Sequence, residues 1–84
     1  MRIIWTEPAI RDLGAASEQM QLVLSAVAAL TEFPGTGRPG RRSGTRELVV
    51  PRTPYIVPYR VRGDAVELLR VLHGRQRRPD GVQR

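Results

Sequence analysis

Several residue types are missing or rare in this chain of 84 residues, and each absence excludes a kind of chemistry. There is no cysteine, which excludes disulfides, thiolate metal sites and cysteine nucleophiles. The one histidine, His73, cannot build a zinc site of the usual kind by itself. No apolar run approaches the length of a membrane-spanning helix, and the N-terminal stretch MRIIWTEPAI lacks the pattern of a signal peptide. We therefore expect a cytoplasmic protein with no metal, no cofactor and no membrane partner.

Lysine is absent too: all 14 basic residues are arginine, and the formal net charge is +6. The arginine guanidinium offers a planar fork of donors that matches carboxylates and phosphates. An acidic protein or a nucleic acid would suit this charge, and an arginine-favouring codon bias in the source genome explains it equally well. The charge therefore indicates an acidic partner without saying which one.

The first part of the chain reads as a strand followed by a helix. Residues 2–5 favour a strand, and Thr6 offers a hydroxyl to cap a helix whose first turn holds Glu7 and Pro8. Glycine inside a helix costs about 1 kcal/mol relative to alanine, so we expect this helix to break at residues 14–16.

A second helix is predicted after that break. Ser17 can cap it, Phe33 extends its apolar stripe, and Pro34 followed by Gly35 ends it. The stripe has the spacing of one helix face and consists of Met20, Val23, Leu24, Val27 and Leu30. Such a stripe is usually part of a hydrophobic core.

Three strands are predicted after a glycine-rich loop at residues 35–44. Their ranges are 45–50, 55–61 and 65–73. Helices that precede an antiparallel meander pack together on one of its faces. The chain therefore predicts a single α+β domain in which a short N-terminal helical segment packs on an antiparallel β-sheet.

The turn between the last two strands predicts their register. Gly63 followed by Asp64 fits a type II′ hairpin turn. Counting outward gives the pairs Arg62–Ala65, Val61–Val66, Arg60–Glu67, Tyr59–Leu68, Val57–Arg70 and Ile56–Val71. The face expected to pack on the helices carries Tyr55, Val57, Tyr59, Val61, Val66, Leu68, Arg70 and Leu72.

The stretch FPGTGRPGRRSGTREL, residues 33–48, contains the glycine spacing G-x-G-x-x-G. A dinucleotide-binding motif of this kind follows a strand and opens a helix, so that the helix N-terminus meets the phosphates. Here the glycines follow a helix, enclose Pro39 and lead into a strand. This order excludes a phosphate-binding loop.

Three stretches resemble the RelE/ParE superfamily of bacterial toxins from type II toxin–antitoxin modules: WTEPAIRDL, FPGTGRPGRR and YIVPYRVRGDAVELLRVLHGRQ. The resemblance spans most of the chain, and the third stretch is the most specific. It implies helices on an antiparallel sheet, in agreement with the order of elements above. It also implies a toxin domain at residues 1–73 and a cognate antitoxin as partner. Residues 74–84, which hold four arginines, are expected to form a basic tail.

The superfamily has two main activities. ParE-like members inhibit DNA gyrase without known catalysis, whereas RelE-like members are endoribonucleases that cut messenger RNA on the ribosome. The RNA-cleaving branch typically has an arginine where this chain has Ile56, and it tends to place a tyrosine in its C-terminal segment, where this chain has none. The resemblance therefore favours a ParE-like gyrase inhibitor that is not an enzyme. A RelE-like ribonuclease and a diverged, non-toxic interaction module are the alternatives.

Different residues are expected to serve each activity. The arginines expected to bind the target are Arg75, Arg77 and Arg78. The catalytic set for the ribonuclease alternative is Arg46, Arg60, His73 and Arg75. The residues expected to bind the antitoxin are Arg38, Arg41, Arg42, Met20 and Val23.

Two ion pairs are expected to be structural. Asp12 can pair with Arg70 between the first helix and the sheet, because an unpaired arginine there would be costly. Arg60 faces Glu67 across the last hairpin. The helical region is shorter than in other superfamily members, so we expect a truncated first helix or a single broken helix.

Overall fold

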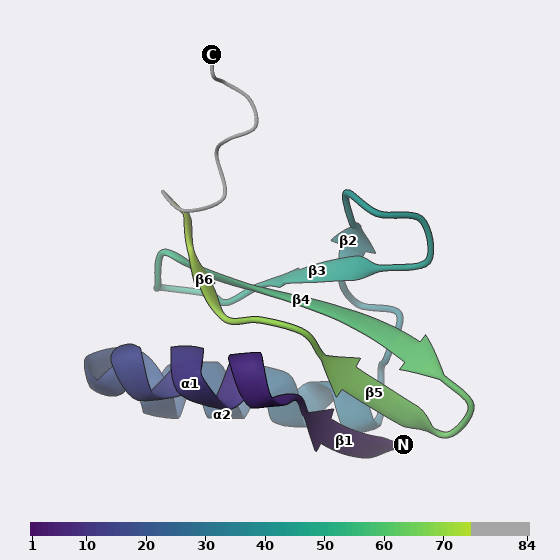
Figure 1. Ribbon diagram of the computed structural model, residues 1–84, viewed down its shortest axis with the longest axis horizontal. Coiled ribbons are helices and arrows are strands. Elements are labelled where there is room, and N and C mark those ends of the chain that lie inside the picture. Colours follow the sequence, from purple (N-terminus) through teal and green to yellow (C-terminus); the bar gives the residue numbers. More distant parts are fainter. Residues whose placement is uncertain (75–84) are drawn as a thin grey trace.

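Two helices cover one face of a six-stranded sheet in the computed structural model, which describes residues 1–74 (Figure 1). The strands are β1 (Arg2–Trp5), β2 (Arg38–Pro39), β3 (Arg46–Val49), β4 (Tyr55–Arg62), β5 (Ala65–Leu68) and β6 (Leu72–His73). Their order is β1-β5-β4-β3-β2, and β6 pairs with β4. All pairs are antiparallel except β1 with β5, which is parallel. The predicted fold class is confirmed, and the parallel edge strand is the feature that the sequence did not predict.

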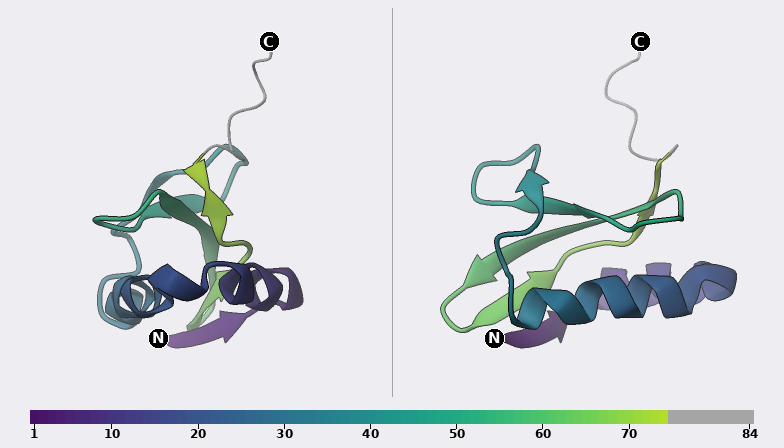
Figure 2. Two further views of the ribbon diagram at one scale, coloured as in Figure 1. Left: turned by 90° about the vertical axis from the view of Figure 1, so that its left-hand side faces the viewer. Right: turned by 180° about the vertical axis from the view of Figure 1, so that it is seen from behind.

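The helical region forms two short helices, α1 (Glu7–Ala15) and α2 (Met20–Ala28), that lie side by side beneath the sheet (Figure 2). The cap at Thr6 is confirmed, because its side-chain oxygen accepts a hydrogen bond from the N–H of Ala9. The break near Gly14 is confirmed as well. The prediction for Ser17 was wrong: it begins a 3₁₀ turn, Ser17–Gln19, and makes no capping hydrogen bond.

Within residues 1–74, no single helix is long and apolar enough to cross a membrane. The helical segments at 7–15 and 17–31, which meet at a bend, are together long and apolar enough by length and composition only. The core helices of other proteins meet the same criterion.

The core lies between α2 and the sheet. Val23, Val27 and Leu30 of the predicted stripe are buried there, against a sheet face that includes Val57 and Leu68. Phe33 does not extend the stripe, since it is 64% exposed. Its chain segment has already left the helix, which ends in a 3₁₀ turn at Ala29–Thr31.

The β4–β5 hairpin has the predicted register near its turn and a bulge farther out. Gly63 has a φ of 60°, as a type II′ turn requires, and Tyr59 pairs with Leu68 as predicted. Beyond Leu69 the register shifts by one residue, so that Ile56 pairs with Leu72 rather than with Val71. Two residues of one strand therefore oppose one residue of the other, as in a β-bulge.

The bulge reverses the predicted directions of two side chains. Val71 is buried in the core, with 2% of its surface exposed, whereas Arg70, predicted on the packing face, is exposed. The N–H of Val71 donates to the carboxylate of Asp12 instead of to β4. A contact with α1 thus compensates the hydrogen bond that the bulge removes from the sheet.

Candidate functional site

The glycine-rich segment is fixed to the sheet by the buried hydroxyl of Tyr59. This hydroxyl accepts a hydrogen bond from the N–H of Gly37 at 2.9 Å and donates one to the carbonyl of Pro34 at 2.7 Å. Arg46 donates to the carbonyl of Gly37 at 2.8 Å. The segment was predicted as loop throughout, but it contains β2, which pairs with β3. Gly37 and Gly40 leave no room for a Cβ atom, so these two glycines serve close packing of the backbone.

The β2–β3 hairpin presents two arginines at its tip. The N–H of Gly40 donates to the carbonyl of Thr45 at 2.8 Å, and Gly44 takes a left-handed φ of 81°. The side chains of Arg41 and Arg42 are exposed on the loop that these contacts close. The hairpin tip therefore holds its two guanidinium groups on a short, closed turn.

Arg38 lies at the base of the same hairpin and is engaged within the fold. Its Nε is 3.2 Å from a carboxylate oxygen of Glu47, a residue with only 5% of its surface exposed. A buried carboxylate needs such a partner, because an unpaired charge away from water is costly. Arg38 therefore has a structural role as the partner of Glu47, in addition to its predicted role in antitoxin binding.

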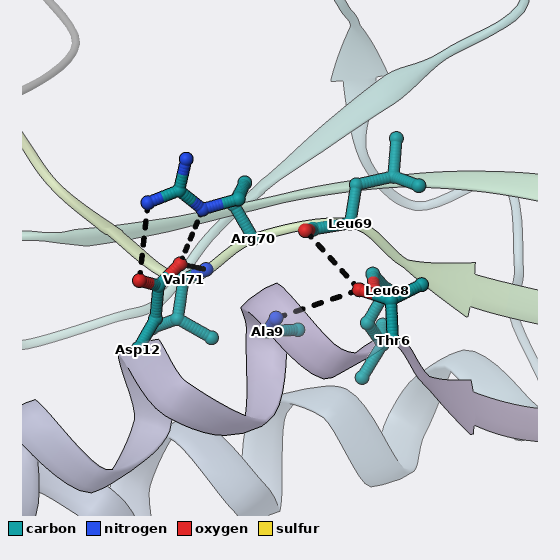
Figure 3. A network of polar contacts seen from close by, with 7 residues as sticks. All are labelled: Thr6, Ala9, Asp12, Leu68, Leu69, Arg70 and Val71. Atoms are coloured by element: carbon teal, nitrogen blue, oxygen red, sulfur yellow. Dashed lines mark hydrogen bonds and ion pairs between the residues drawn. The ribbon is translucent and has the colours of Figure 1, made fainter.

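A network of polar contacts ties α1 to the bulge (Figure 3). The carboxylate of Asp12 accepts hydrogen bonds from Nε of Arg70 at 2.6 Å, from Nη2 of Arg70 at 3.1 Å and from the N–H of Val71 at 2.9 Å. Burial by itself raises the pKa of Asp12, but these hydrogen bonds outweigh it and hold the pKa below its ordinary value. The hydroxyl of Thr6 donates to the carbonyl of Leu68 at 2.7 Å, so the first turn of α1 holds the same segment. The structure thus brings together the predicted Asp12–Arg70 pair.

The second predicted pair is present on the opposite face of the sheet. Nε of Arg60 is 2.7 Å from a carboxylate oxygen of Glu67, and Arg62 lies 4.0 Å from the same atom. The hydrogen bond from Arg60 lowers the pKa of Glu67. Both arginines therefore have a partner within the hairpin.

The residues predicted for ribonuclease chemistry are not brought together. Arg46 of β3 pairs with Tyr59 of β4, so these two side chains lie on the same face of the sheet. Arg60 follows Tyr59 in β4 and therefore projects from the other face. His73 pairs with Tyr55, which lies four positions, or about 13 Å, along β4 from Tyr59. Arg75 lies outside the described residues. Within residues 1–74, no group of three or more His, Cys, Asp or Glu side chains could hold a metal ion.

One contact in this region was missed at the sequence level. The rings of Tyr55 and His73 meet edge to face, with centroids 5.4 Å apart. The predicted register placed Tyr55 opposite Leu72, and the bulge moved His73 into that position. No local sequence signal predicts the bulge, because the residue that stabilises it, Asp12, lies 59 residues before Val71.

The two predicted apolar contacts for the antitoxin differ in exposure. Val23 is completely buried in the core, and its contact with the antitoxin stays a prediction. Met20, at the start of α2, is half-buried and reaches the surface. The stripe turns Val23 and Val27 towards the sheet, so the exposed surface of α2 lies on its other side.

A helix pair packed on one face of a mixed, mostly antiparallel sheet is the fold that the resemblance to the RelE/ParE superfamily implied. The chain belongs to the family of ParE toxins of type II toxin–antitoxin (ParDE) systems, whose sequence pattern matches residues 3–78. It is 43% identical to the putative toxin Y4kP of Sinorhizobium fredii, over 93% of each chain. It is 35% identical to toxin RelE1 of Caulobacter vibrioides, over 90% of this chain and 81% of the relative.

Two solved structures share the fold. One is the chromosomal ParDE toxin–antitoxin system of P. aeruginosa, with a TM-score of 0.79, 30% identity and coverage of 87% of this chain and 95% of that chain. The other is the toxin–antitoxin complex RelBE2 of Mycobacterium tuberculosis, with a TM-score of 0.58, 29% identity and coverage of 86% and 88%. Both likenesses extend over most of the chain.

Proposed function

We propose that this protein is a ParE-like toxin that acts in the cytoplasm by inhibiting DNA gyrase and is neutralised by a small acidic antitoxin. The observation that carries the proposal is the match of the ParE toxin family to residues 3–78. The higher TM-score with the ParDE system than with the RelBE2 complex, 0.79 against 0.58, supports the same branch. In this proposal, Arg75, Arg77 and Arg78 contact the target.

The arrangement of the residues considered for catalysis supports a toxin that is not a ribonuclease. Arg46 and Arg60 project from opposite faces of the sheet, and each is engaged with groups of the fold. The resemblance implies an arginine at position 56 in the RNA-cleaving branch. This chain has Ile56 there, and Ile56 pairs with Leu72. General acid–base catalysis needs its groups within hydrogen-bond reach of one substrate position.

We expect the purified protein to inhibit the supercoiling of relaxed plasmid by gyrase. The measurement is the concentration that halves the supercoiled product, with a topoisomerase relaxation assay as the control for general binding to DNA. A truncated chain that ends at residue 74 should inhibit at least about tenfold more weakly, because it lacks charge-assisted contacts of the tail. If gyrase stays active at every workable concentration while ribosome-bound message is cut, the gyrase proposal is wrong.

The ribonuclease remains the second candidate because of two observations. The chain is 35% identical to toxin RelE1, and the contact of Tyr55 with His73 joins two side chains capable of proton transfer. If the protein is a ribonuclease, protein synthesis in a translation extract should stop before supercoiling by gyrase is affected. A chain whose strong expression is harmless without any partner would instead support the non-toxic interaction module.

Antitoxin binding is proposed to use the exposed hairpin tip. Replacing Arg41 and Arg42 together by glutamine should weaken the affinity for the antitoxin encoded beside this gene about tenfold or more. The control is the double variant Arg2→Gln with Arg62→Gln, which removes the same charge from exposed positions beside the β4–β5 turn. Calorimetric titration of each variant gives the affinities. Equal weakening by both variants would indicate general electrostatic attraction instead of a contact at the hairpin tip.

A further inference from the structure

Arg52 has a backbone conformation that is unusual for an arginine. It occupies the second central position of the turn between β3 and β4, after Pro51, and its φ is 66°. The N–H of Thr53 donates to the carbonyl of Val50 at 3.3 Å and closes the turn. This is the geometry of a type II turn, whose second central position strongly favours glycine or asparagine. Among the described residues, Arg52 is the only one other than glycine with a positive φ.

No contact within the fold explains the choice of arginine at this position. Arg52 is exposed, and within residues 1–74 its guanidinium has no hydrogen bond or ion pair. The arginines with a side-chain partner in the same part of the chain include Arg2, Arg38, Arg46, Arg60 and Arg70. A strained residue whose side chain stabilises nothing locally points to a function outside the fold.

Hydrogen bonds on both sides of Arg52 hold the backbone of the turn. The hydroxyl of Thr53 donates to the carbonyl of Val50 at 3.0 Å and accepts from the N–H of Tyr55 at 2.9 Å. The N–H of Val50 donates to the carbonyl of Tyr55 at 3.0 Å, and Val50 itself is buried. A backbone that is already ordered adds no ordering cost when its side chain binds, which favours the use of such a turn in recognition.

The turn lies beside the point where the chain leaves the sheet. The N–H of Gly74 donates to the carbonyl of Pro54 at 2.6 Å, and β6 runs alongside the start of β4 (Figure 1). The next residues in the sequence include Arg75, Arg77 and Arg78, the proposed target contacts. Arg52 therefore lies on the folded domain at the end from which these arginines continue.

We propose that Arg52 is a target-contact residue of the toxin, held in a left-handed turn so that its guanidinium binds a carboxylate on an acidic protein surface. The inference rests on the proposed toxic function and adds a target contact on the folded domain. A guanidinium suits a carboxylate because the two groups can form two parallel hydrogen bonds.

The test compares Arg52→Asn and Arg52→Lys in the full chain with Arg62→Gln as control. Asparagine tolerates the left-handed conformation, so Arg52→Asn should raise Tm by about 2–5 °C. The same variant should need about tenfold more protein to inhibit gyrase and should arrest growth more weakly on induction. Arg52→Lys keeps the charge but not the planar fork, and we expect an intermediate loss. Arg62→Gln removes one charge from the far end of β4 and should stay near wild type in both assays.

The outcomes separate this inference from the gyrase proposal. If Arg52→Asn raises Tm and leaves growth arrest at the wild-type level, Arg52 is not a target contact, whatever the target is. If the wild type arrests growth without inhibiting gyrase, the gyrase proposal fails, and a loss of growth arrest in Arg52→Asn still supports the contact. If Arg52→Asn weakens only the binding of the toxin to plasmid DNA, the proposed ligand, a carboxylate on a protein surface, is wrong. A wild-type chain that does not arrest growth would overturn both.

Discussion

Replacing Gly37 by alanine should lower the free energy of unfolding by about 3 kcal/mol, because the new methyl group overpacks a buried site and breaks its hydrogen bonds. A Cβ atom at this position would lie 2.7 Å from both Cε1 and Oη of Tyr59 and 2.9 Å from the carbonyl oxygen of Glu47. Tyr59 is completely buried, and the Glu47 carbonyl belongs to the backbone of β3, so neither can move away cheaply. The hydrogen bond from Gly37 to Tyr59 would be lost with the displacement.

Gly35 provides the matched control, two residues earlier in the same segment. A Cβ atom there would meet nothing within 4 Å. Gly35→Ala should therefore change the free energy of unfolding by less than about 0.5 kcal/mol. Urea unfolding followed by the fluorescence of Trp5, the single tryptophan, measures both variants. Similar small effects at the two positions would show that the segment is not packed on Tyr59 as described.

Replacing Asp12 by alanine should destabilise the protein by about 2–3 kcal/mol at neutral pH, because three hydrogen bonds to its carboxylate are lost at once. The variant leaves the N–H of Val71 and the guanidinium of Arg70 without their acceptor. Asp64→Asn is the control, since the Asp64 carboxylate pairs with Arg2 at an exposed site and should contribute little. A double-mutant cycle of Asp12→Ala with Arg70→Met would measure the coupling between the two side chains.

The Asp12 contribution should depend on pH in a defined direction. The folded pKa of Asp12 lies below its ordinary value of 3.8, so the unfolded state binds the proton more readily. The stabilisation is therefore fully present above about pH 5 and is lost as the pH falls through the folded pKa. The difference in stability between wild type and Asp12→Ala should shrink over this acidic range. A difference that is constant with pH would show that the carboxylate charge is not the source of the effect.

The same variants test whether the Asp12–Arg70 pair is structural. If toxicity falls in Arg70→Met while thermal stability is unchanged, the pair serves target recognition and its structural assignment fails. Loss of both together would fit a contact that holds the bulge and, through it, β6.

Local sequence signals predicted most of the secondary structure, for reasons that act over a few residues. The hydroxyl of Thr6 caps α1, the helix breaks near Gly14, and Gly63 sets the hairpin register as far as Leu69. Each of these depends on backbone preference or on hydrogen bonds between near neighbours. The apolar stripe likewise identified Val27 and Leu30 as core residues.

The features that define the candidate site depend on residues far apart in the chain, and the local pattern therefore missed them. The bulge is stabilised by Asp12, so the register beyond Leu69 and the burial of Val71 follow from the packing of α1 on the sheet. The role of Gly37 follows from the Tyr59 hydroxyl, 22 residues later. The composition and motifs were sufficient to indicate the toxin superfamily, because they reflect the order of elements. The opposite faces of Arg46 and Arg60 and the contact of Tyr55 with His73 required the packed chain, since they depend on strand pairing.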